Sequence, residues 1–356
     1  MIVKQAYAFQ LKGNPVSCQK YGGGHINQTL KITTDAGCEY ILQRINKYVF
    51  KDPVKLMENA SSVTSFIRER SEDPRSALHF ISTHNGQYYH QDEDGEFWRA
   101  YDFVGGFCLD MPESDEDFYQ SALAFGKFQH MLSDFPADTL YETIPNFHNT
   151  PDRYRQLKES IEADIMGRKK NVLPEIQQAL AFEEMGCTLQ KMLDAGQLPL
   201  RVTHNDTKLN NVLLDKKTRK CLCVLDLDTV MPGLSAYDFG DSIRSGAATA
   251  AEDAQDPSKM KINLHLYEVY TKGFLEAATS LTDLEKEVLP LGAFTMTLEV
   301  GIRFLKDYLD GDLYFKTAYP EHNLVRARTQ LALAADMQKN WEQMVAITAR
   351  VAAGNH

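Results

Sequence analysis

Two acidic segments near the middle of the chain contain the side chains best suited to metal-assisted chemistry. The first places His204, Asp206 and Asn211 in the pattern His-x-Asp-x-x-x-x-Asn between apolar residues. The second, a short distance further on, places Asp226 and Asp228 in an apolar stretch. Carboxylate and amide oxygens are the ligands that a hard cation such as Mg²⁺ prefers. The spacing therefore predicts a site in which one carboxylate accepts a proton and other oxygens hold a metal ion.

This combination is typical of phosphoryl transfer from ATP, in which an Asp accepts the proton of the attacking hydroxyl while an Asn and a second Asp hold Mg²⁺ against the phosphates. We therefore assign Asp206 as the base and Asn211 and Asp226 as metal ligands, with Asp228 either a further ligand or a structural residue. His204 is expected to support the loop by hydrogen bonding, since Asp206 already accepts the proton. The alternative, that these are ordinary turn residues, is disfavoured by the second acidic segment.

Other charged residues near this motif are candidates for support or for contact with the reactants. Lys208 either contacts a phosphate or is a solvated loop lysine. Asp238, Asp241 and Arg244 are expected to support the catalytic loop, with contact to the substrate as the alternative. The letters Asp238-Phe239-Gly240 resemble a kinase metal tripeptide, but no apolar strand precedes them, and we assign the metal to Asp226 instead.

A glycine-rich segment near the N-terminus predicts a cover for phosphates. Gly23 and Gly24 lie between two expected strands, where backbone N–H groups can approach a nucleotide. His25 follows them and either faces the cleft between the two expected lobes or is a surface histidine. On the third expected strand either Gln43 or Arg44 can face the phosphates, because neighbouring side chains alternate between faces; Arg44 would supply the cation.

Composition limits the classes of partner. The chain has 356 residues, a formal net charge of −11 and six scattered cysteines. An acidic chain is a poor partner for nucleic acid, whose phosphates require a basic surface. The sequence contains no long apolar run and no recognisable signal peptide, so we expect no membrane span. The scattered cysteines favour a reducing, cytoplasmic location.

The order of the expected elements predicts an α+β fold with two lobes. Residues 1–105 read as a β-rich N-lobe that binds the nucleotide, with a hairpin at 28–33 and 39–45, a helix at 53–70 capped by Asp52, and further strands at 79–83, 88–89 and 97–104. Gly105-Gly106 breaks this pattern. Residues 106–356 read as a larger, mainly helical C-lobe that carries the catalytic loop and the substrate site. Its expected helices are 114–132, 154–165, 174–195, 265–278, 282–309 and 323–352.

Five segments, spread over nearly the whole chain, carry a resemblance to a known family. They are residues 21–27, 40–46, 201–211, 238–244 and 319–326. Together they resemble the aminoglycoside phosphotransferase superfamily of small-molecule kinases, and look most like bacterial N-acetylhexosamine 1-kinases. The resemblance implies a kinase-like bilobal fold, ATP as co-substrate, Mg²⁺, and transfer of the γ-phosphoryl group to the 1-hydroxyl of N-acetylglucosamine or N-acetylgalactosamine. It also implies that His25, Arg303 and Tyr314 contact the sugar.

Two other interpretations are open from the residues. One is another small-molecule kinase of the same fold, acting on choline, homoserine or an aminoglycoside. A cationic acceptor of that kind would fit the acidic net charge but would require several carboxylates or aromatic groups around it. The other is a kinase-like binding module without turnover, which the presence of Asp206, Asn211 and Asp226 disfavours.

Overall fold

The computed structural model describes residues 3–22 and 27–354. By their internal contacts these residues group into two compact units. The first unit comprises Met1–Cys108, Asp134–Pro145 and Val212–Pro232, and the second comprises Leu109–Ser133, Asn146–Asn211 and Gly233–His356. The second acidic segment, with Asp226, is thus counted with the β-rich first unit, whereas Asp206 is counted with the helical second unit. The expected lobe boundary at residue 105 stays a prediction.

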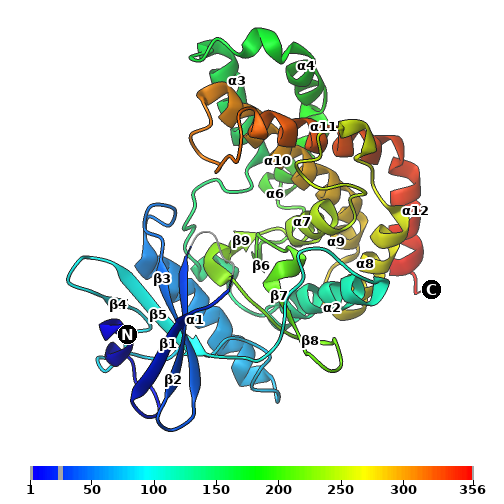
Figure 1. Cartoon of the computed structure of the whole chain (residues 1–356). Helices are drawn as coiled ribbons and strands as arrows, with labels where there is room; N and C mark the ends of the chain where they lie inside the picture. Colours follow the sequence, from blue (N-terminus) through cyan, green and yellow to red (C-terminus); the bar gives the residue numbers. More distant parts are fainter. Residues whose placement is uncertain (1–2, 23–26, 355–356) are drawn as a thin grey trace. The chain divides into compact units, whose positions relative to one another are not determined.

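The first unit is built on a five-stranded antiparallel sheet in the order β1-β2-β3-β5-β4 (Figure 1). Its strands are β1 (Pro15–Lys20), β2 (Gln28–Thr34), β3 (Glu39–Ile45), β4 (His90–Gln91) and β5 (Phe97–Asp102). The hairpin expected at 28–33 and 39–45 is confirmed. The hairpin forms because apolar side chains alternate along its strands and lie on one face of the sheet. Leu30 and Ile32 of β2 are buried with Tyr40, Leu42 and Trp98 in one apolar cluster.

The opposite face of this sheet lies against helix α1 (Pro53–Arg70), since the Arg99 guanidinium on β5 lies 3.8 Å from the Met57 sulfur. The helix begins where the sequence predicts, because the Asp52 side chain accepts from the Lys55 N–H at 3.1 Å and Pro53 occupies the first turn. A short 3-10 helix, η1 (Lys4–Ala8), precedes the sheet. The face shared by Gln43 and Arg99 is therefore enclosed by α1.

Two short strands expected between α1 and β5 were placed wrongly. Phe80 and Thr83 form only isolated bridges, to Tyr101 and Phe9, and the two-residue strand β4 begins at His90 rather than at Tyr88. Thr83 causes the difference, because its hydroxyl accepts from the Gln87 N–H at 3.1 Å and closes a turn at this point.

A second hairpin of the first unit carries the acidic metal-binding candidate. Strands β7 (Val212–Leu214) and β8 (Cys221–Val224) pair with Val212 opposite Val224. The Asp215 carboxylate closes their turn by accepting from the N–H groups of Lys217 and Thr218, each at 2.9 Å. The 3-10 helix η5 (Leu227–Thr229) follows, and the first unit also contains η2 (Ala137–Thr139). Strand β9 (Met231–Gly233) comes next along the chain.

The second unit is mainly helical, and α10 lies at its centre against α3, α7 and α11 (Figure 1). Its elements are α2 (Asp115–Met131), α3 (Thr150–Ala163), η3 (Lys169–Asn171), α4 (Leu173–Ala181), α5 (Glu183–Gly186), α6 (Thr188–Asp194), β6 (Arg201–Thr203), η4 (Leu209–Asn211), α7 (Ser235–Gly246), η6 (Pro257–Lys259), α8 (Leu264–Ala277), α9 (Asp283–Glu287), α10 (Leu289–Asp310), α11 (His322–Lys339) and α12 (Trp341–Ala352).

Three expected long helices are interrupted. The region 174–195 is divided into α4, α5 and α6. The region 282–309 breaks at Val288, because Pro290 in the first turn of α10 has no N–H to continue the preceding helix. The region 323–352 breaks at Asn340, whose side chain donates to the Asp336 carbonyl at 2.8 Å and competes with the helical backbone. Helix α7 was not predicted.

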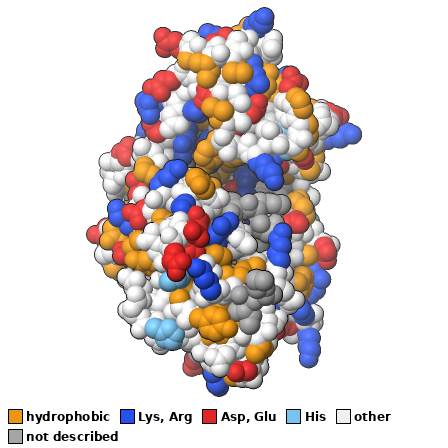
Figure 2. All heavy atoms as spheres, turned by 60° about the vertical axis from the view of Figure 1, so that its left-hand side comes forward, with side chains coloured by type: hydrophobic (Ala, Val, Ile, Leu, Met, Phe, Trp, Pro, Cys, Tyr) orange, Lys and Arg blue, Asp and Glu red, His pale blue; other side chains and the backbone are white. Residues whose placement is uncertain are grey.

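The surface does not concentrate the acidic charge on the side that Figure 2 shows. There, Lys and Arg side chains are interspersed with Asp, Glu and hydrophobic ones. Within residues 3–22 and 27–354, every helix is too short or too polar to cross a lipid bilayer.

Candidate active site

Hydrogen bonds to Asp238 of α7 hold the loop that carries Asp206. The buried Asp238 carboxylate accepts from the backbone N–H groups of His204, at 2.9 Å, and Asn205, at 2.8 Å, and from the Gln129 amide at 2.6 Å. The Asp238 carbonyl accepts from the Thr207 hydroxyl. Burial raises the pKa of Asp238, and the His204 ring and the donated hydrogen bonds only partly oppose this. The tripeptide 238–240 thus lies within a buried helix.

Backbone conformation turns this loop so that Asn211 meets Asp206. Asn205 has a φ of 64°, a left-handed conformation that Asn tolerates. The Asn211 amide nitrogen donates to the Asp206 carbonyl at 2.8 Å and to its carboxylate at 3.0 Å. The buried His204 ring packs edge-on against Phe125 of α2, and its Nδ1 accepts from the Asp206 N–H at 3.3 Å. Both predicted residues Asp206 and Asn211 therefore lie in one small loop.

The Asp206 carboxylate is partly accessible and strongly ionised. Its side chain is 30% exposed, and Oδ1 lies 2.8 Å from the Lys208 ammonium. Burial raises the pKa of Asp206, but Lys208, His204 and the Asn211 amide together hold it below its ordinary value. The same pairing raises the pKa of Lys208, with a further contribution from Asp241. Asp206 is consequently ionised throughout the neutral range.

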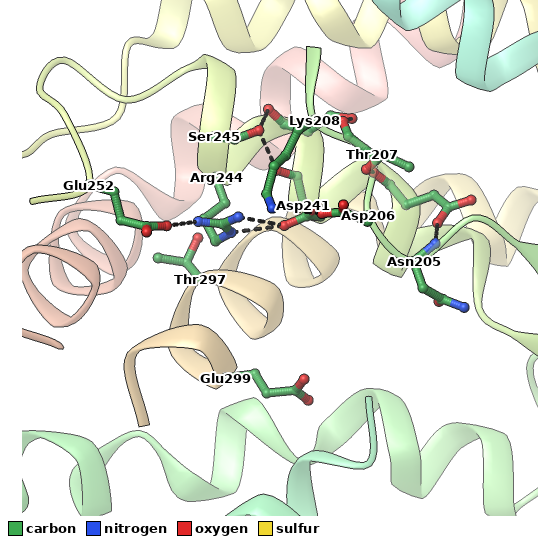
Figure 3. Close-up of polar contacts among 12 residues, drawn as sticks. Asn205, Asp206, Thr207, Lys208, Asp241, Arg244, Ser245, Glu252, Thr297 and Glu299 are labelled. Atoms are coloured by element: carbon green, nitrogen blue, oxygen red, sulfur yellow. Dashed lines mark hydrogen bonds and ion pairs between the residues drawn. The ribbon is translucent and has the colours of Figure 1, made fainter. Parts of the chain in front are cut away.

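A second ion-pair cluster lies beside this loop on α7. Figure 3 shows the Arg244 guanidinium between Asp241 and Glu252. Its Nη2 lies 2.8 Å from Asp241 Oδ1, and its Nη1 lies 2.7 Å from Glu252. Burial lowers the pKa of Arg244, but the two carboxylates raise the pKa by more than burial lowers it. The guanidinium therefore stays charged. These contacts fit a supporting role for the 241–244 segment.

Predicted nucleotide contacts of the first unit fall into three groups. Gly23, Gly24 and the sugar candidate His25 lie outside the described residues. The Arg44 side chain is 44% exposed, and its nearest anion is Glu96 at 4.0 Å. Gln43 instead lies on the face enclosed by α1, where its Oε1 accepts from the Arg99 guanidinium at 2.9 and 2.6 Å. The contribution of Arg44 to nucleotide binding stays a prediction.

Sequence reasoning missed Arg99, the buried cation of this face. Its side chain is 3% exposed and forms an ion pair with Asp228, which is 2% exposed. The available signal was an arginine within the apolar strand 97–102. Asp226, two residues before Asp228, is exposed and has a left-handed φ of 55°.

The predicted sugar contacts Arg303 and Tyr314 lie near one another in the second unit. We call this group the Arg303 cluster: its guanidinium carbon lies 5.3 Å from the ring centre of Phe147, 5.5 Å from that of Phe315 and 5.9 Å from that of Tyr314. The Asp307 carboxylate positions the loop by accepting from the Tyr314 N–H at 2.8 Å and the Phe315 N–H at 2.9 Å. The Tyr314 ring, 66% exposed, is available to a ligand.

A buried pair connects the Arg303 cluster to the catalytic loop. Glu299, one turn before Arg303 on α10, accepts from the Thr150 hydroxyl at 2.9 Å and lies 2.8 Å from His148 Nδ1. The other ring nitrogen of His148 lies 3.4 Å from the Asn205 carbonyl oxygen. Burial raises the pKa of Glu299, but His148 and Arg303 together lower the pKa by more than burial raises it. The Glu299 carboxylate is therefore ionised. Glu299 and His148 were not predicted as site residues.

Comparison with known proteins identifies the family. Residues 17–270 match the model of the phosphotransferase enzyme family. The chain belongs to this family. The matched part of this phosphotransferase contains the four predicted site residues Asp206, Asn211, Asp226 and Asp238. The match ends before Arg303 and Tyr314.

Solved structures show that this phosphotransferase has a kinase-like fold. The aminoglycoside phosphotransferase of Alicyclobacillus acidocaldarius is 15% identical, with 99% of this chain and 97% of that one covered, at a TM-score of 0.65. Amicoumacin kinase in complex with AMP-PNP, Ca²⁺ and Ami is 12% identical, with 92% of this chain and 91% of that one covered, at a TM-score of 0.58. Choline kinase of Cryptosporidium parvum is 12% identical, covering 96% and 92%, at 0.57. At these identities the likeness concerns the fold.

Proposed function

We propose that this phosphotransferase transfers the γ-phosphoryl group of ATP to the 1-hydroxyl of N-acetylglucosamine or N-acetylgalactosamine. The observation that carries the proposal is the Arg303 cluster, a cation surrounded by aromatic rings and joined through Glu299 and His148 to the loop of Asp206. A neutral acetylated sugar presents carbonyl and hydroxyl oxygens to such a donor, and its C–H faces pack on aromatic rings.

The chemical step requires little more than positioning. The anomeric oxygen attacks the γ-phosphorus, the bond from that phosphorus to the ADP oxygen breaks, and the hydroxyl proton passes to the Asp206 carboxylate. Because phosphoryl transfer has a loose transition state, the orientation of the acceptor matters more than the strength of the base. This suits Asp206, whose low pKa makes it a weak base but a constant hydrogen-bond acceptor.

Asn211 and Asp226 fit the role of Mg²⁺ ligands by the chemistry of their atoms. The Asn211 amide nitrogen is committed to Asp206, which leaves the carbonyl oxygen of its side chain for a metal. Among the described residues, His, Cys, Asp and Glu side chains form no group of three that could hold a metal by themselves. Mg²⁺ characteristically takes only one or two protein ligands and completes its shell with phosphates and water. When bound, it neutralises charge on the β- and γ-phosphates.

The charges around the Arg303 cluster favour a neutral acceptor over a cationic one. Burial lowers the pKa of Arg153, and the nearby Arg303 guanidinium lowers it further. The ionised Glu299 offsets part of this positive charge, but two guanidinium groups against one carboxylate would still repel choline or a protonated aminoglycoside. The alternative, a kinase for choline, homoserine or an aminoglycoside, draws on structural relatives such as choline kinase and the aminoglycoside phosphotransferase.

An acceptor panel tests the proposal. The chain is incubated with Mg²⁺, ATP and one of N-acetylglucosamine, N-acetylgalactosamine, glucose, choline, homoserine or kanamycin, and ADP release is measured. We expect the highest kcat/KM with an N-acetylhexosamine. A higher kcat/KM with choline or kanamycin would overturn the sugar assignment and keep the phosphotransferase activity. ADP release with none of the six would contradict both acceptor assignments.

A further inference from the structure

Both carboxylate oxygens of Asp228 are already hydrogen-bonded within the first unit. Oδ1 accepts from Nη1 of the Arg99 guanidinium, and Oδ2 accepts from the Asn27 amide at 2.6 Å. The Asp228 and Arg99 side chains are almost completely buried. A buried ion pair of this kind is costly to break, because removal of one partner leaves the other charge uncompensated. Asp228 is therefore poorly placed to rotate towards a metal ion.

The two donors belong to different parts of the sheet. Arg99 lies in the middle of β5, opposite Gln43 on β3, and Gln43 in turn donates to the Thr29 hydroxyl on β2 at 2.9 Å. These contacts make a continuous polar row across three neighbouring strands beneath α1. Asp228 closes that row at its Arg99 end.

Asn27 adds the second connection, at the start of β2. Its Nδ2 donates to Asp228, and its Oδ1 accepts from the Asn46 N–H at 2.9 Å. Both ends of this side chain are thus used, one at the end of β3 and one at the turn that carries Asp226. In sequence, Asn27 lies three residues after Gly24. A substitution at Asn27 would therefore affect the turn that carries Asp226 through the Asp228 side chain.

We propose that Asp228 is a positioning residue rather than a metal ligand. It fixes the turn Asp226–Thr229 to β5 through Arg99 and to the start of β2 through Asn27, so that the carboxylate of Asp226 is held in place for the metal–nucleotide complex. The inference rests on the proposed phosphotransfer function but is independent of the acceptor. It resolves the two roles that the sequence allowed for Asp228.

A double-mutant cycle in the full chain tests this inference. Asn27→Ala, Asp228→Asn, the double variant and Asp226→Asn are compared with wild type for kcat, KM for ATP and KM for acceptor. Each single change at 27 or 228 should lower kcat/KM for ATP by about 10-fold, the lower end of what loss of a metal-orienting partner costs. The double variant should lose less than the product of the two factors, because both changes remove the Asn27–Asp228 hydrogen bond, although Asp228→Asn also weakens the ion pair with Arg99. KM for ATP should rise while KM for the acceptor stays within about twofold; a general loss of folded protein would instead lower kcat and leave both KM values unchanged.

Metal binding separates a positioning residue from a ligand. Mn²⁺ binding in the presence of AMP-PNP is followed by electron paramagnetic resonance for Asp228→Asn and Asp226→Asn. We expect Asp228→Asn to keep the wild-type number of bound Mn²⁺ ions and Asp226→Asn to lose one. Loss of an ion in Asp228→Asn, or multiplicative effects of Asn27→Ala and Asp228→Asn, would overturn the inference.

Controls separate this inference from the proposed function. Asn14→Ala, in the same unit, changes an exposed side chain that donates to the Asp35 carboxylate at 3.1 Å, and should leave kcat/KM for ATP unchanged. If wild type binds Mn²⁺ and AMP-PNP but phosphorylates no sugar, the acceptor assignment fails and the test of Asp228 proceeds by binding. A wild-type chain that does not bind Mn²⁺ with AMP-PNP would contradict the proposed function and this inference together.

Discussion

Three side chains define the proposed catalytic loop at the scale of single residues. Asp206 is partly exposed and ionised, Asn211 is hydrogen-bonded to it, and buried Asp238 holds the backbone beneath both. The different roles of the Asp206 and Asp238 carboxylates follow from their different burial. A carboxylate that accepts two backbone N–H groups is a structural element, whereas a carboxylate that solvent can reach can accept a proton from a substrate.

Replacement of the proposed base should remove most turnover. Asp206→Asn keeps the size of the side chain but cannot take up the hydroxyl proton, so kcat should fall by about 10²–10⁴-fold while AMP-PNP binding persists. Steady-state kinetics and calorimetric titration measure the two quantities. Asp138→Asn, at an exposed acidic residue, is the matched control. Wild-type kcat in Asp206→Asn would remove this residue from the mechanism.

Removal of Lys208 should shift the pH dependence. Burial raises the pKa of Asp206, and the Lys208 ammonium is the largest influence that lowers it. In Lys208→Met the folded-state pKa of Asp206 should therefore rise, and the acid limb of the kcat/KM profile should move to higher pH. Because the wild-type pKa of Asp206 is already below its ordinary value, profiles that extend below about pH 4 for both forms are needed to measure the direction of this shift. A lower kcat with an unmoved acid limb would assign Lys208 to the phosphates alone.

Helices α7 and α10 are the elements that position the site in the second unit. Helix α7 supplies Asp238, and α10 supplies Glu299 and Arg303. Their close approach depends on two glycines, because a Cβ at Gly240 would overlap the Gly292 carbonyl and one at Gly292 would overlap the Ala236 carbonyl. The position of the catalytic loop relative to the Arg303 cluster is therefore set by helix packing.

A methyl group at the helix contact should lower stability. Gly240→Ala would push α7 away from α10, and we expect a loss of about 1–3 kcal/mol in the free energy of unfolding. Chemical denaturation measures it. Gly105→Ala is the matched control, since its Cβ would have no neighbour within 4 Å. Equal stability of the two variants would show that the helices adjust without cost.

Truncation of Arg303 should act on the acceptor more than on the nucleotide. Loss of hydrogen bonds to a charged group costs about 1.5–3 kcal/mol, which corresponds to a rise in KM for the sugar of roughly 10- to 150-fold. Arg303→Ala and the control Lys306→Ala, from the next turn of α10, are compared with both substrates varied. If the KM values for sugar and ATP rise equally in Arg303→Ala, the residue is structural.

At the scale of the whole molecule, the sequence predicts what short-range patterns determine. Alternating apolar residues predicted β2 and β3, and Asp52 with Pro53 predicted the start of α1. The closeness of Asp206 and Asn211 follows from their spacing in one loop. Helix α7 was missed because it is buried on nearly every side and so lacks a one-sided apolar stripe. The Arg99–Asp228 pair was missed because its partners are 129 residues apart.

The most direct test of the central claim is a single ³¹P NMR measurement of the product formed from ATP and N-acetylglucosamine that carries ¹⁸O at C1. Attack by the anomeric oxygen predicts an anomeric phosphate signal that couples to the C1 proton and shows the isotope shift of a retained C1–oxygen bond. A phosphate signal without that shift would place the phosphoryl group on another hydroxyl. The absence of any sugar phosphate while ATP is consumed with choline or kanamycin would contradict the account.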